Sequence, residues 1–362
     1  MFLEAETAFG LNLLNTFPAN ESLVFSPLSI ALALSLVHAG AKGDTRTQIG
    51  DTLLKGSKDD ELAGHFSKIG NDLKNPTNSD VQTNVANRIF LKNGFTVEKS
   101  YSEFVEKHFA ADAQTIDFTN GAEAAKIVNE FIKKNTGNKI DNVVQSSTFQ
   151  DALALLVNAI YFKAKWREEF TKSGAEREFS KSTNDVKKIP FMSSYMEDQD
   201  YAEDDIFQVL SLPYKDTSYR CLFFLPKEKH GLASALKKLD DKRFQELAGK
   251  TKTTYATVHL PKVDLKKELE LVPILEQLGI NDVFSNNADL SGMAKGVKIS
   301  DVIHHAVIKI DEEGTTAAAA VVVKAVPMMA RMEEPVDFIA DHPFLFAVVK
   351  DNHPLFLGTF FG

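Results

Sequence analysis

The chain has 362 residues, 44% of them hydrophobic and 25% charged, which is typical of globular proteins. Its net charge of −9 argues against a nucleic-acid partner, because a phosphate-binding surface needs clustered Lys and Arg. The single cysteine, Cys221, excludes an intramolecular disulfide. No stretch approaches the length of uninterrupted apolar sequence that a membrane span needs, so no membrane partner is expected.

The N-terminal stretch has no basic region followed by a long apolar segment, so no secretory signal is predicted. Together with the single cysteine, this favours a reducing, cytoplasmic setting. Secretion through an uncleaved or a lost signal, and with it an extracellular location, stays open as the alternative.

The first half of the chain is mainly helical in pattern. Residues 2–17 place apolar side chains at helical spacing. Residues 26–43 predict a buried helix, with Ser26 as N-cap and Pro27 at the first helical position. Residues 124–140 are amphipathic and end at the stop signal "NTGN".

Strand patterns dominate the second half. Residues 152–166, "ALALLVNAIYFKAKW", are almost continuously apolar, as in a central strand covered on both faces. Short apolar segments bounded by turn residues follow at 219–226, 254–261, 304–311, 341–351 and 354–361. The chain shows no repeat, no linker and no break in composition, so a single α+β domain over residues 1–362 is predicted.

The sequence offers no catalytic motif. HExxH, GxSxG and GxGxxG are all absent. His304 and His305 are adjacent, so on a regular strand they point to opposite faces and cannot bind one metal together. Cys221 lies in an apolar strand, where a buried thiol is usually inert. We therefore expect neither enzyme activity nor a metal or other cofactor.

Several segments, in order, resemble the serpin family, in particular the intracellular, ovalbumin-like inhibitory serpins of clade B. They are "LVFSPLSIALALSLVHAGAKGDTRTQI" (23–49), "LVNAIYFKAKWREEF" (156–170), "LPKVDL…LGINDVFSNNADLSGM" (260–293), "HHAVIKIDEEGTTAAAA" (304–320) and "DHPFLFAVVKDNHPLFLGTFFG" (341–362). The sequence departs from the family at Val263, where Phe is usual, and in its last residues, "TFFG".

The resemblance implies a single-domain α+β fold with three β-sheets, about nine helices and an exposed reactive-centre loop at about 312–337. Such a loop baits a protease, which attacks it and forms an acyl-enzyme. The cleaved loop then inserts into the central sheet as a new strand and distorts the protease, so the protein is a metastable suicide inhibitor of serine endopeptidases, with cysteine endopeptidases as further candidate targets. The alternative is a non-inhibitory serpin acting as a binding, storage or chaperone protein.

The loop sequence suits insertion. From Thr315 to Val323 it has no charge and no Pro, and such residues cost little to bury in a sheet. Side chains alternate along a strand, and the face that the resemblance implies to point outward carries the one charge, Lys324. Non-inhibitory members such as ovalbumin carry bulky or charged hinges, which this chain lacks. The predicted hinge consists of Glu312, Gly314, Thr315, Thr316, Ala317, Ala318, Ala319 and Ala320.

The family register, counted from the hinge, places the cleaved bond between Met328 and Met329. Counting back from residue 341 points nearer Met332, so Arg331, Met332 and Glu333 stay open as alternatives. Met favours an elastase- or chymotrypsin-like protease, because an apolar pocket accepts it. Arg331 would suit a trypsin-like enzyme and Glu333 an acid-preferring one, and papain-like proteases such as cathepsins are also candidates.

The resemblance also assigns residues that control the sheet. Ser26, Ser29, Asn158 and His304, the shutter cluster, match the polar group beneath the central sheet. Trp166, Lys262 and Glu312, the breach group, match the site where the loop enters, and a Lys262–Glu312 salt bridge is predicted before insertion. We expect a monomer that can polymerise by loop–sheet insertion, and no polyanion cofactor.

Overall fold

The computed structural model describes residues 2–54, 59–74, 80–109, 111–171, 175–315 and 334–362. Within these ranges the chain forms nine α-helices, which confirms the predicted α+β class. They are α1 (Phe2–Thr16), α2 (Pro27–Gly40), α3 (Gly43–Leu53), α4 (Asp59–Lys74), α5 (Lys99–Phe109), α6 (Gly121–Asn135), α7 (Leu232–Leu236), α8 (Asp241–Lys250) and α9 (Val272–Gln277), with short 3-10 helices at Ser146–Phe149 and Asp282–Phe284.

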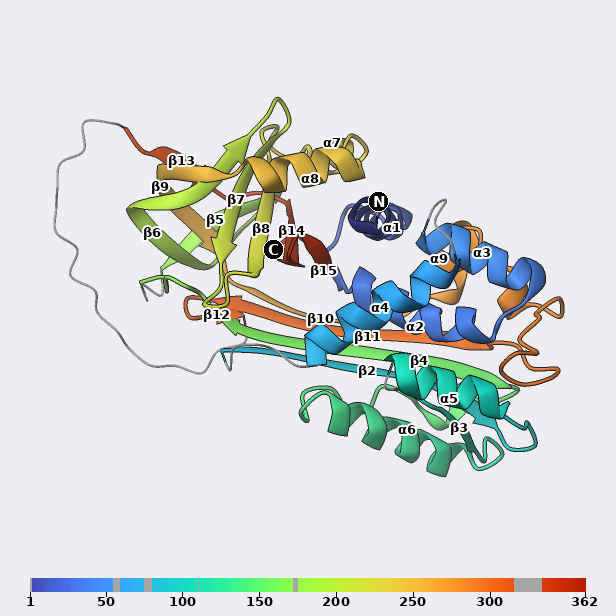
Figure 1. The fold of residues 1–362 in the computed structure, drawn as a ribbon. Coiled ribbons are helices and arrows are strands. Elements are labelled where there is room, and N and C mark those ends of the chain that lie inside the picture. Colours follow the sequence, from blue (N-terminus) through green and yellow to red (C-terminus); the bar gives the residue numbers. More distant parts are fainter. Residues whose placement is uncertain (1, 55–58, 75–79, 110, 172–174, 316–333) are drawn as a thin grey trace.

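A six-stranded sheet extends along the length of the molecule (Figure 1). Its strands lie in the order β10-β11-β12-β4-β2-β3. In chain order they are β2 (Val81–Lys92), β3 (Ala113–Ile116), β4 (Ala154–Lys165), β10 (Val263–Glu270), β11 (Asp301–Asp311) and β12 (Gly314–Thr315).

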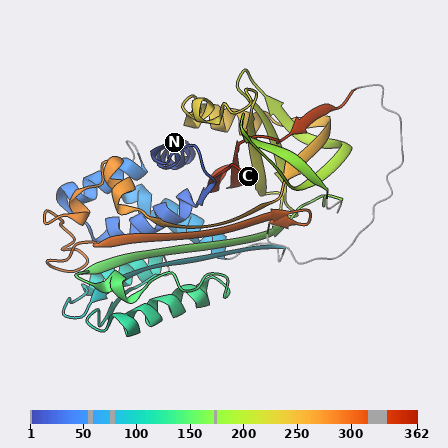
Figure 2. The ribbon, with the colours of Figure 1, turned by 180° about the vertical axis from the view of Figure 1, so that it is seen from behind.

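The second sheet packs at one end of the first, and the N-terminal helix α1 lies beside it, packed on β15 (Figures 1 and 2). Its main path is β1-β15-β14-β8-β7-β6-β9-β13, and β5 pairs with β6. The strands are β1 (Leu23–Phe25), β5 (Glu176–Ser182), β6 (Asp185–Glu203), β7 (Phe207–Pro213), β8 (Tyr219–Pro226), β9 (Lys252–Pro261), β13 (Val336–Ile339), β14 (Phe344–Lys350) and β15 (His353–Phe360).

The strand pairings agree with the three sheets expected. Besides the six-stranded sheet, the 19-residue strand β6 takes part in two sets of pairings. Its first residues pair with β5, and its later residues pair with β9 and β7, so these two sheets are continuous through β6.

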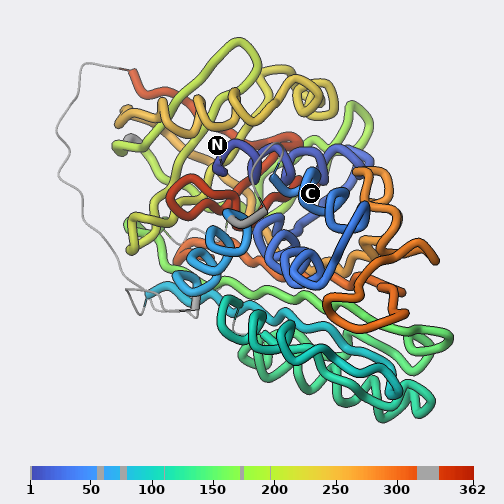
Figure 3. The backbone as a smooth tube through the Cα atoms, turned by 45° about the vertical axis from the view of Figure 1, so that its right-hand side comes forward, coloured from blue at the N-terminus to red at the C-terminus, as the bar shows by residue number. Residues whose placement is uncertain are grey.

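The predicted central strand is confirmed as β4, and it is buried on both faces. Its residues alternate between two hydrophobic clusters, one on the side of α2 and one on the side of α6. Figure 3 shows α6 beneath the sheet, opposite the N-terminal helices, whereas α5 packs on α2 and α4. Layers on both sides explain why the strand is apolar throughout rather than alternating.

The start of α2 is also as predicted. Ser26 is the N-cap, and its hydroxyl accepts a hydrogen bond from the Ser29 N–H, while Pro27 occupies the first helical position. This cap fixes the N-terminus of α2 against the middle of β4, where the functional cluster described below is found. No helix in the described ranges is long and apolar enough to cross a membrane.

Candidate functional site

The two-residue strand β12 lies between the ends of β4 and β11. Thr315 pairs with Ile310 of β11 and with Ala164 of β4, and Gly314 pairs with Asp311 and Lys165. Farther along, β4 and β11 pair directly with each other, from Leu155 and Asp301 to Tyr161 and Val307. The sheet is therefore split at one end by the first residues of the predicted loop and closed below them.

Gly314 adopts a backbone conformation that only glycine takes readily. Its φ is +150°, and a Cβ atom at this position would lie 2.1 Å from the Ala164 carbonyl oxygen. The close approach to β4 thus requires a residue without a side chain. Gly314 lies where the chain turns back from β11 into β12, in close contact with β4. Its role as the hinge stays a prediction.

Thr315 is fully buried, and its side chain meets an aromatic pair. Its hydroxyl lies 2.7 Å from the Tyr214 hydroxyl, and the Tyr214 ring stacks on Trp166 with centroids 4.5 Å apart. The Trp166 indole N–H donates to the Asp311 carbonyl oxygen at 2.8 Å. These contacts place Thr315 on the core-facing side of the sheet and attach the end of β11 to β4.

The predicted ion pair beside this point is confirmed. Lys262 Nζ lies 2.7 Å from Glu312 Oε1, with side-chain exposures of 33% and 7%. The backbone carbonyl of Glu312 also accepts a hydrogen bond from the Phe170 N–H at 2.9 Å. Burial raises the pKa of the neighbouring Asp311 carboxyl. The breach group Trp166, Lys262 and Glu312 therefore does assemble around the turn between β11 and β12.

The shutter cluster also assembles, beneath the part of the sheet where β4 and β11 pair directly. His304 accepts a hydrogen bond at Nε2 from the Ser26 N–H at 3.1 Å, and its Nδ1 contacts Asn158 Oδ1. Asn158 donates to the Ser29 carbonyl at 3.1 Å and to its hydroxyl at 2.5 Å. All four residues are at most 1% exposed. Side chains of β4, β11 and α2 are thus bound in one buried network.

The two adjacent histidines of β11 are held in the neutral form. Burial, with a smaller contribution from His305, lowers the pKa of His304 to about 3. Burial and the nearby Lys266 lower the pKa of His305 to about 4. The two side chains project to opposite faces of the sheet, as predicted, because they are neighbours on a regular strand.

One member of this network was not predicted. Asn87 of β2 lies opposite Asn158, and its Oδ1 accepts a hydrogen bond from Asn158 Nδ2. It extends the network to a third strand. Sequence offered no signal for it, because Asn87 lies in a segment of mixed polarity and acquires its role only through pairing with β4.

The rest of the predicted site falls on residues 316–333, outside the described residues. These are the hinge residues Thr316, Ala317, Ala318, Ala319 and Ala320, the predicted bond Met328–Met329, and the alternatives Arg331, Met332 and Glu333. The described chain resumes before β13, which pairs in parallel with β9 of the second sheet.

Comparison with known families gives one match over nearly the whole chain. The model of the serpin family, described as "serine protease inhibitor", matches residues 4–362. Chicken (Gallus gallus) neuroserpin is 31% identical, over 93% of this chain and 84% of its own length. Human (Homo sapiens) Serpin B8 is 32% identical, over 99% of this chain and 98% of its own length.

Solved structures agree. Serpin48, a highly specific serpin of the insect Tenebrio molitor, superposes with a TM-score of 0.89 at 28% identity, covering 100% of this chain and 98% of that one. Human thyroxine-binding globulin, solved with thyroxine, gives a TM-score of 0.89 at 25% identity with the same coverage. The fold is thus shared with a highly specific serpin and with a protein that binds thyroxine.

Proposed function

The chain belongs to the serpin family, and from this premise we propose that it inhibits serine endopeptidases by inserting its reactive-centre loop into the six-stranded sheet. Protease inhibition is the general activity of the family, whereas a ligand-binding relative shows that membership alone does not decide it. The proposal therefore depends on the residues of this chain.

The observation that carries the proposal is the position of β12. Gly314 and Thr315, near the start of the loop, are already a strand between β4 and β11, and these two strands pair directly below it. Insertion needs only to continue this strand and separate the remaining β4–β11 pairs. The next residues are small and apolar, so the continuation carries no charge to bury until Lys324.

The register of β12 predicts which residues of β4 and β11 each loop residue would lie beside after insertion. Every further residue moves one position back along β4 from Ala164 and along β11 from Ile310. Val321, six residues after Thr315, would therefore lie between Asn158 and His304. Since these two side chains now contact each other, insertion would replace their contact with an apolar side chain.

The alternation of side chains favours the same outcome. Thr315 faces the core, so Ala317, Ala319, Val321 and Val323 would follow it on that face, and Lys324 would lie on the opposite face. If the register of β12 is extended, loop residues 324 and 325 reach the first residues of β11 and β4, so the inserted strand would end there. A cleaved bond between Met328 and Met329 lies just beyond that limit and would release enough strand to fill the sheet.

A methionine before the cleaved bond suits an elastase- or chymotrypsin-like target with an apolar pocket. The alternatives are trypsin-like, acid-preferring and cathepsin-like proteases. The cytoplasmic location and monomeric state predicted from the sequence also stay predictions.

Incubation of the purified protein with elastase, chymotrypsin, trypsin and cathepsins tests the proposal. We expect an SDS-stable complex with at least one serine protease, and stoichiometric loss of activity for a cysteine protease, whose thioester complex is labile. Mass analysis of the released C-terminal peptide identifies the cleaved bond. Clean cleavage of the loop by every protease, with no loss of protease activity, would instead support the non-inhibitory binding or chaperone role.

A further inference from the structure

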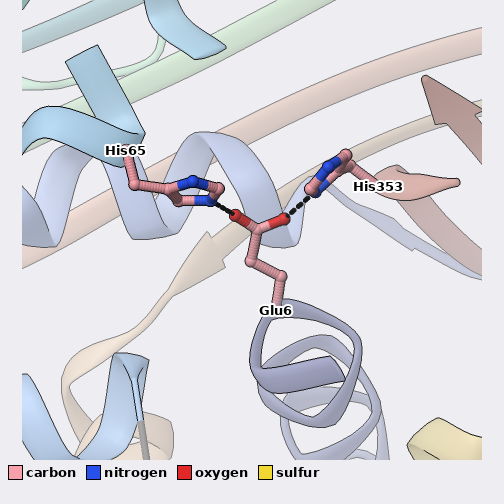
Figure 4. A group of neighbouring side chains, drawn as sticks. All are labelled: Glu6, His65 and His353. Atoms are coloured by element: carbon pink, nitrogen blue, oxygen red, sulfur yellow. Dashed lines mark hydrogen bonds and ion pairs between the residues drawn. The ribbon is translucent and has the colours of Figure 1, made fainter. Parts of the chain in front are cut away.

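Three side chains from distant parts of the chain converge on one point outside the inhibitory machinery. Glu6 of α1 contacts His65 of α4 through Oε1 and His353 of β15 through Oε2 (Figure 4). The potential ligand atoms, His65 Nε2, His353 Nδ1 and the carboxylate oxygens, lie within 4.8 Å of one another. Among the described residues this is the one group with the composition and spacing of a metal site.

The position of His353 is fixed by a tight turn. It is the first residue of β15 and pairs with Lys350 across the two-residue turn Asp351–Asn352. Both turn residues have positive φ, 49° and 69°, which is the geometry that closes a β-hairpin most compactly. The Asn352 side chain also accepts a hydrogen bond from Arg220, so the hairpin end is anchored to the sheet.

The other two side chains are held as firmly. The His65 ring stacks on Phe2 with centroids 4.1 Å apart and meets Phe66 edge-on at 5.3 Å. Glu6 is 5% exposed, whereas His65 and His353 are 16% and 25% exposed.

We propose that Glu6, His65 and His353 form a binding site for a zinc ion, with water as the fourth ligand. Two imidazole nitrogens and one carboxylate oxygen are a ligand set that Zn²⁺ accepts, and three protein ligands leave one tetrahedral position for water. The partial exposure of both imidazoles provides a path for that water. This departs from the expectation, drawn from the sequence, that the chain binds no metal.

The chemistry favours a borderline metal over a hard one. Imidazole suits Zn²⁺, Co²⁺, Ni²⁺ and Cu²⁺, whereas Mg²⁺ and Ca²⁺ require oxygen ligands, of which the group offers only one carboxylate. His65 would bind through Nε2 and His353 through Nδ1, each with its proton on the other ring nitrogen. Bond lengths of about 2.0–2.2 Å would draw the three ligands together by small side-chain rotations.

A bound zinc ion would connect α1, α4 and β15, which backbone hydrogen bonds of the described residues do not join to one another. α1, α4 and β15 meet at this point, and α4 also packs on α2 and on β2 of the six-stranded sheet. An ion bound by the native state would stabilise it by mass action. The inference is independent of the inhibitory function, since none of its residues belongs to the loop, the breach group or the shutter cluster.

Cobalt and zinc titrations of the chelator-treated full-length protein test the site. We expect one Co²⁺ per chain with the intense visible absorption of a tetrahedral complex, displaced by Zn²⁺, and a dissociation constant in the micromolar range or tighter. A hundred-fold excess of Zn²⁺ over this constant should raise the thermal midpoint by roughly 4 °C, and Mg²⁺ should not.

The variants His65→Ala and His353→Ala should each weaken Co²⁺ binding by at least about 100-fold and abolish the absorption. His108→Ala, which removes an imidazole of α5 that lies 4.5 Å from the Phe104 ring, is the matched control and should bind as the wild type does. Circular dichroism verifies that each variant is folded. Equal affinity in the wild type and the His65→Ala/His353→Ala double variant, or millimolar binding without the tetrahedral spectrum, would overturn the proposal.

Discussion

The centres of the two sheets are held together in different ways. In the nine-stranded sheet, β14 is buried between β8 and β15 by apolar side chains, and Phe344 to Val349 have no exposed surface. In the six-stranded sheet, the central pair β4–β11 meets α2 through the hydrogen-bonded side chains of Asn158 and His304. The centre of the nine-stranded sheet is thus held by apolar packing, whereas the centre of the six-stranded sheet also contains a network of side-chain hydrogen bonds.

This difference indicates which sheet can admit a strand. In the nine-stranded sheet, β14 pairs with β8 and β15 along its length. In the six-stranded sheet, β12 already separates β4 from β11 at one end. Further opening there breaks the β4–β11 pairs and the Asn158–His304 contact, and the inserting strand would form new backbone pairs with both strands.

The largest expected effect comes from Thr315→Arg, at the point where the strand already enters the six-stranded sheet. Thr315 has no exposed surface and contacts Tyr214, so an Arg there would keep β12 out of the sheet. Insertion would then have to bury the charge, at a cost of several kcal/mol. We expect inhibition to fall by at least about 100-fold, since 1.4 kcal/mol is tenfold. The loop should still be cleaved, so the inhibitor becomes a substrate.

Thr316→Arg is the matched control, because side chains alternate and residue 316 would face outward in an inserted strand. It should retain most of the inhibition. Equal loss in both variants would argue that the charge acts on protease docking, and undiminished inhibition by Thr315→Arg would show that insertion is not the mechanism.

Asn158→Ala should have the next largest effect, because it removes the hub of the shutter cluster. Ser29 and His304 each lose a buried hydrogen bond and Asn87 loses a partly buried one, and unsatisfied buried groups cost about 1–3 kcal/mol each. We expect the free energy of unfolding to fall by about 3 kcal/mol or more. Size-exclusion chromatography during mild heating should show faster polymer formation.

Ser211→Ala offers the corresponding change in the nine-stranded sheet. Ser211 of β7 is equally buried and accepts a hydrogen bond from Arg220 at 3.3 Å. It should lower stability without accelerating polymer formation. If both variants polymerise alike at equal loss of stability, the contrast between the sheets has no functional meaning.

Acid should weaken the polar centre through His304. Its pKa is about 3 in the folded state, below the ordinary value of about 6.5, so the unfolded state binds the proton first. The stability that neutral His304 contributes is complete above pH 6.5 and is lost as the pH falls toward 3. Between pH 7 and 5 the loss should be about 2 kcal/mol. Urea unfolding at both pH values, compared with His304→Gln, measures it, and an equal pH dependence in the variant would contradict it.

Much of this architecture could be predicted from the sequence because local pattern decides it. The cap at Ser26 and Pro27 and the continuous apolar run of β4 each follow from a few neighbouring residues. The breach group and shutter cluster were assigned only by resemblance, and their contacts then proved to be present.

Contacts set by tertiary pairing could not be predicted. Asn87 joins the network only because β2 lies in register with β4. Glu6 and His353 are 347 positions apart and meet through the packing of α1 on the β14–β15 hairpin. The sharing of β6 between two of the sheets likewise depends on the length of this strand, which no local motif specifies.

Glu312→Lys should have the smallest effect of these changes, because the Lys262–Glu312 pair lies at the edge of the opening and Lys262 is 33% exposed. Charge reversal replaces an attraction with a repulsion between two lysines, at a cost of about 1–2 kcal/mol. The repulsion acts where β12 enters, so we expect premature opening, seen as polymers on a native gel at a lower temperature than for the wild type. The double variant Lys262→Glu/Glu312→Lys restores opposite charges and should recover most of the difference. A single variant that stayed monomeric and fully inhibitory would show that this pair, unlike the shutter cluster, does not hold the sheet closed.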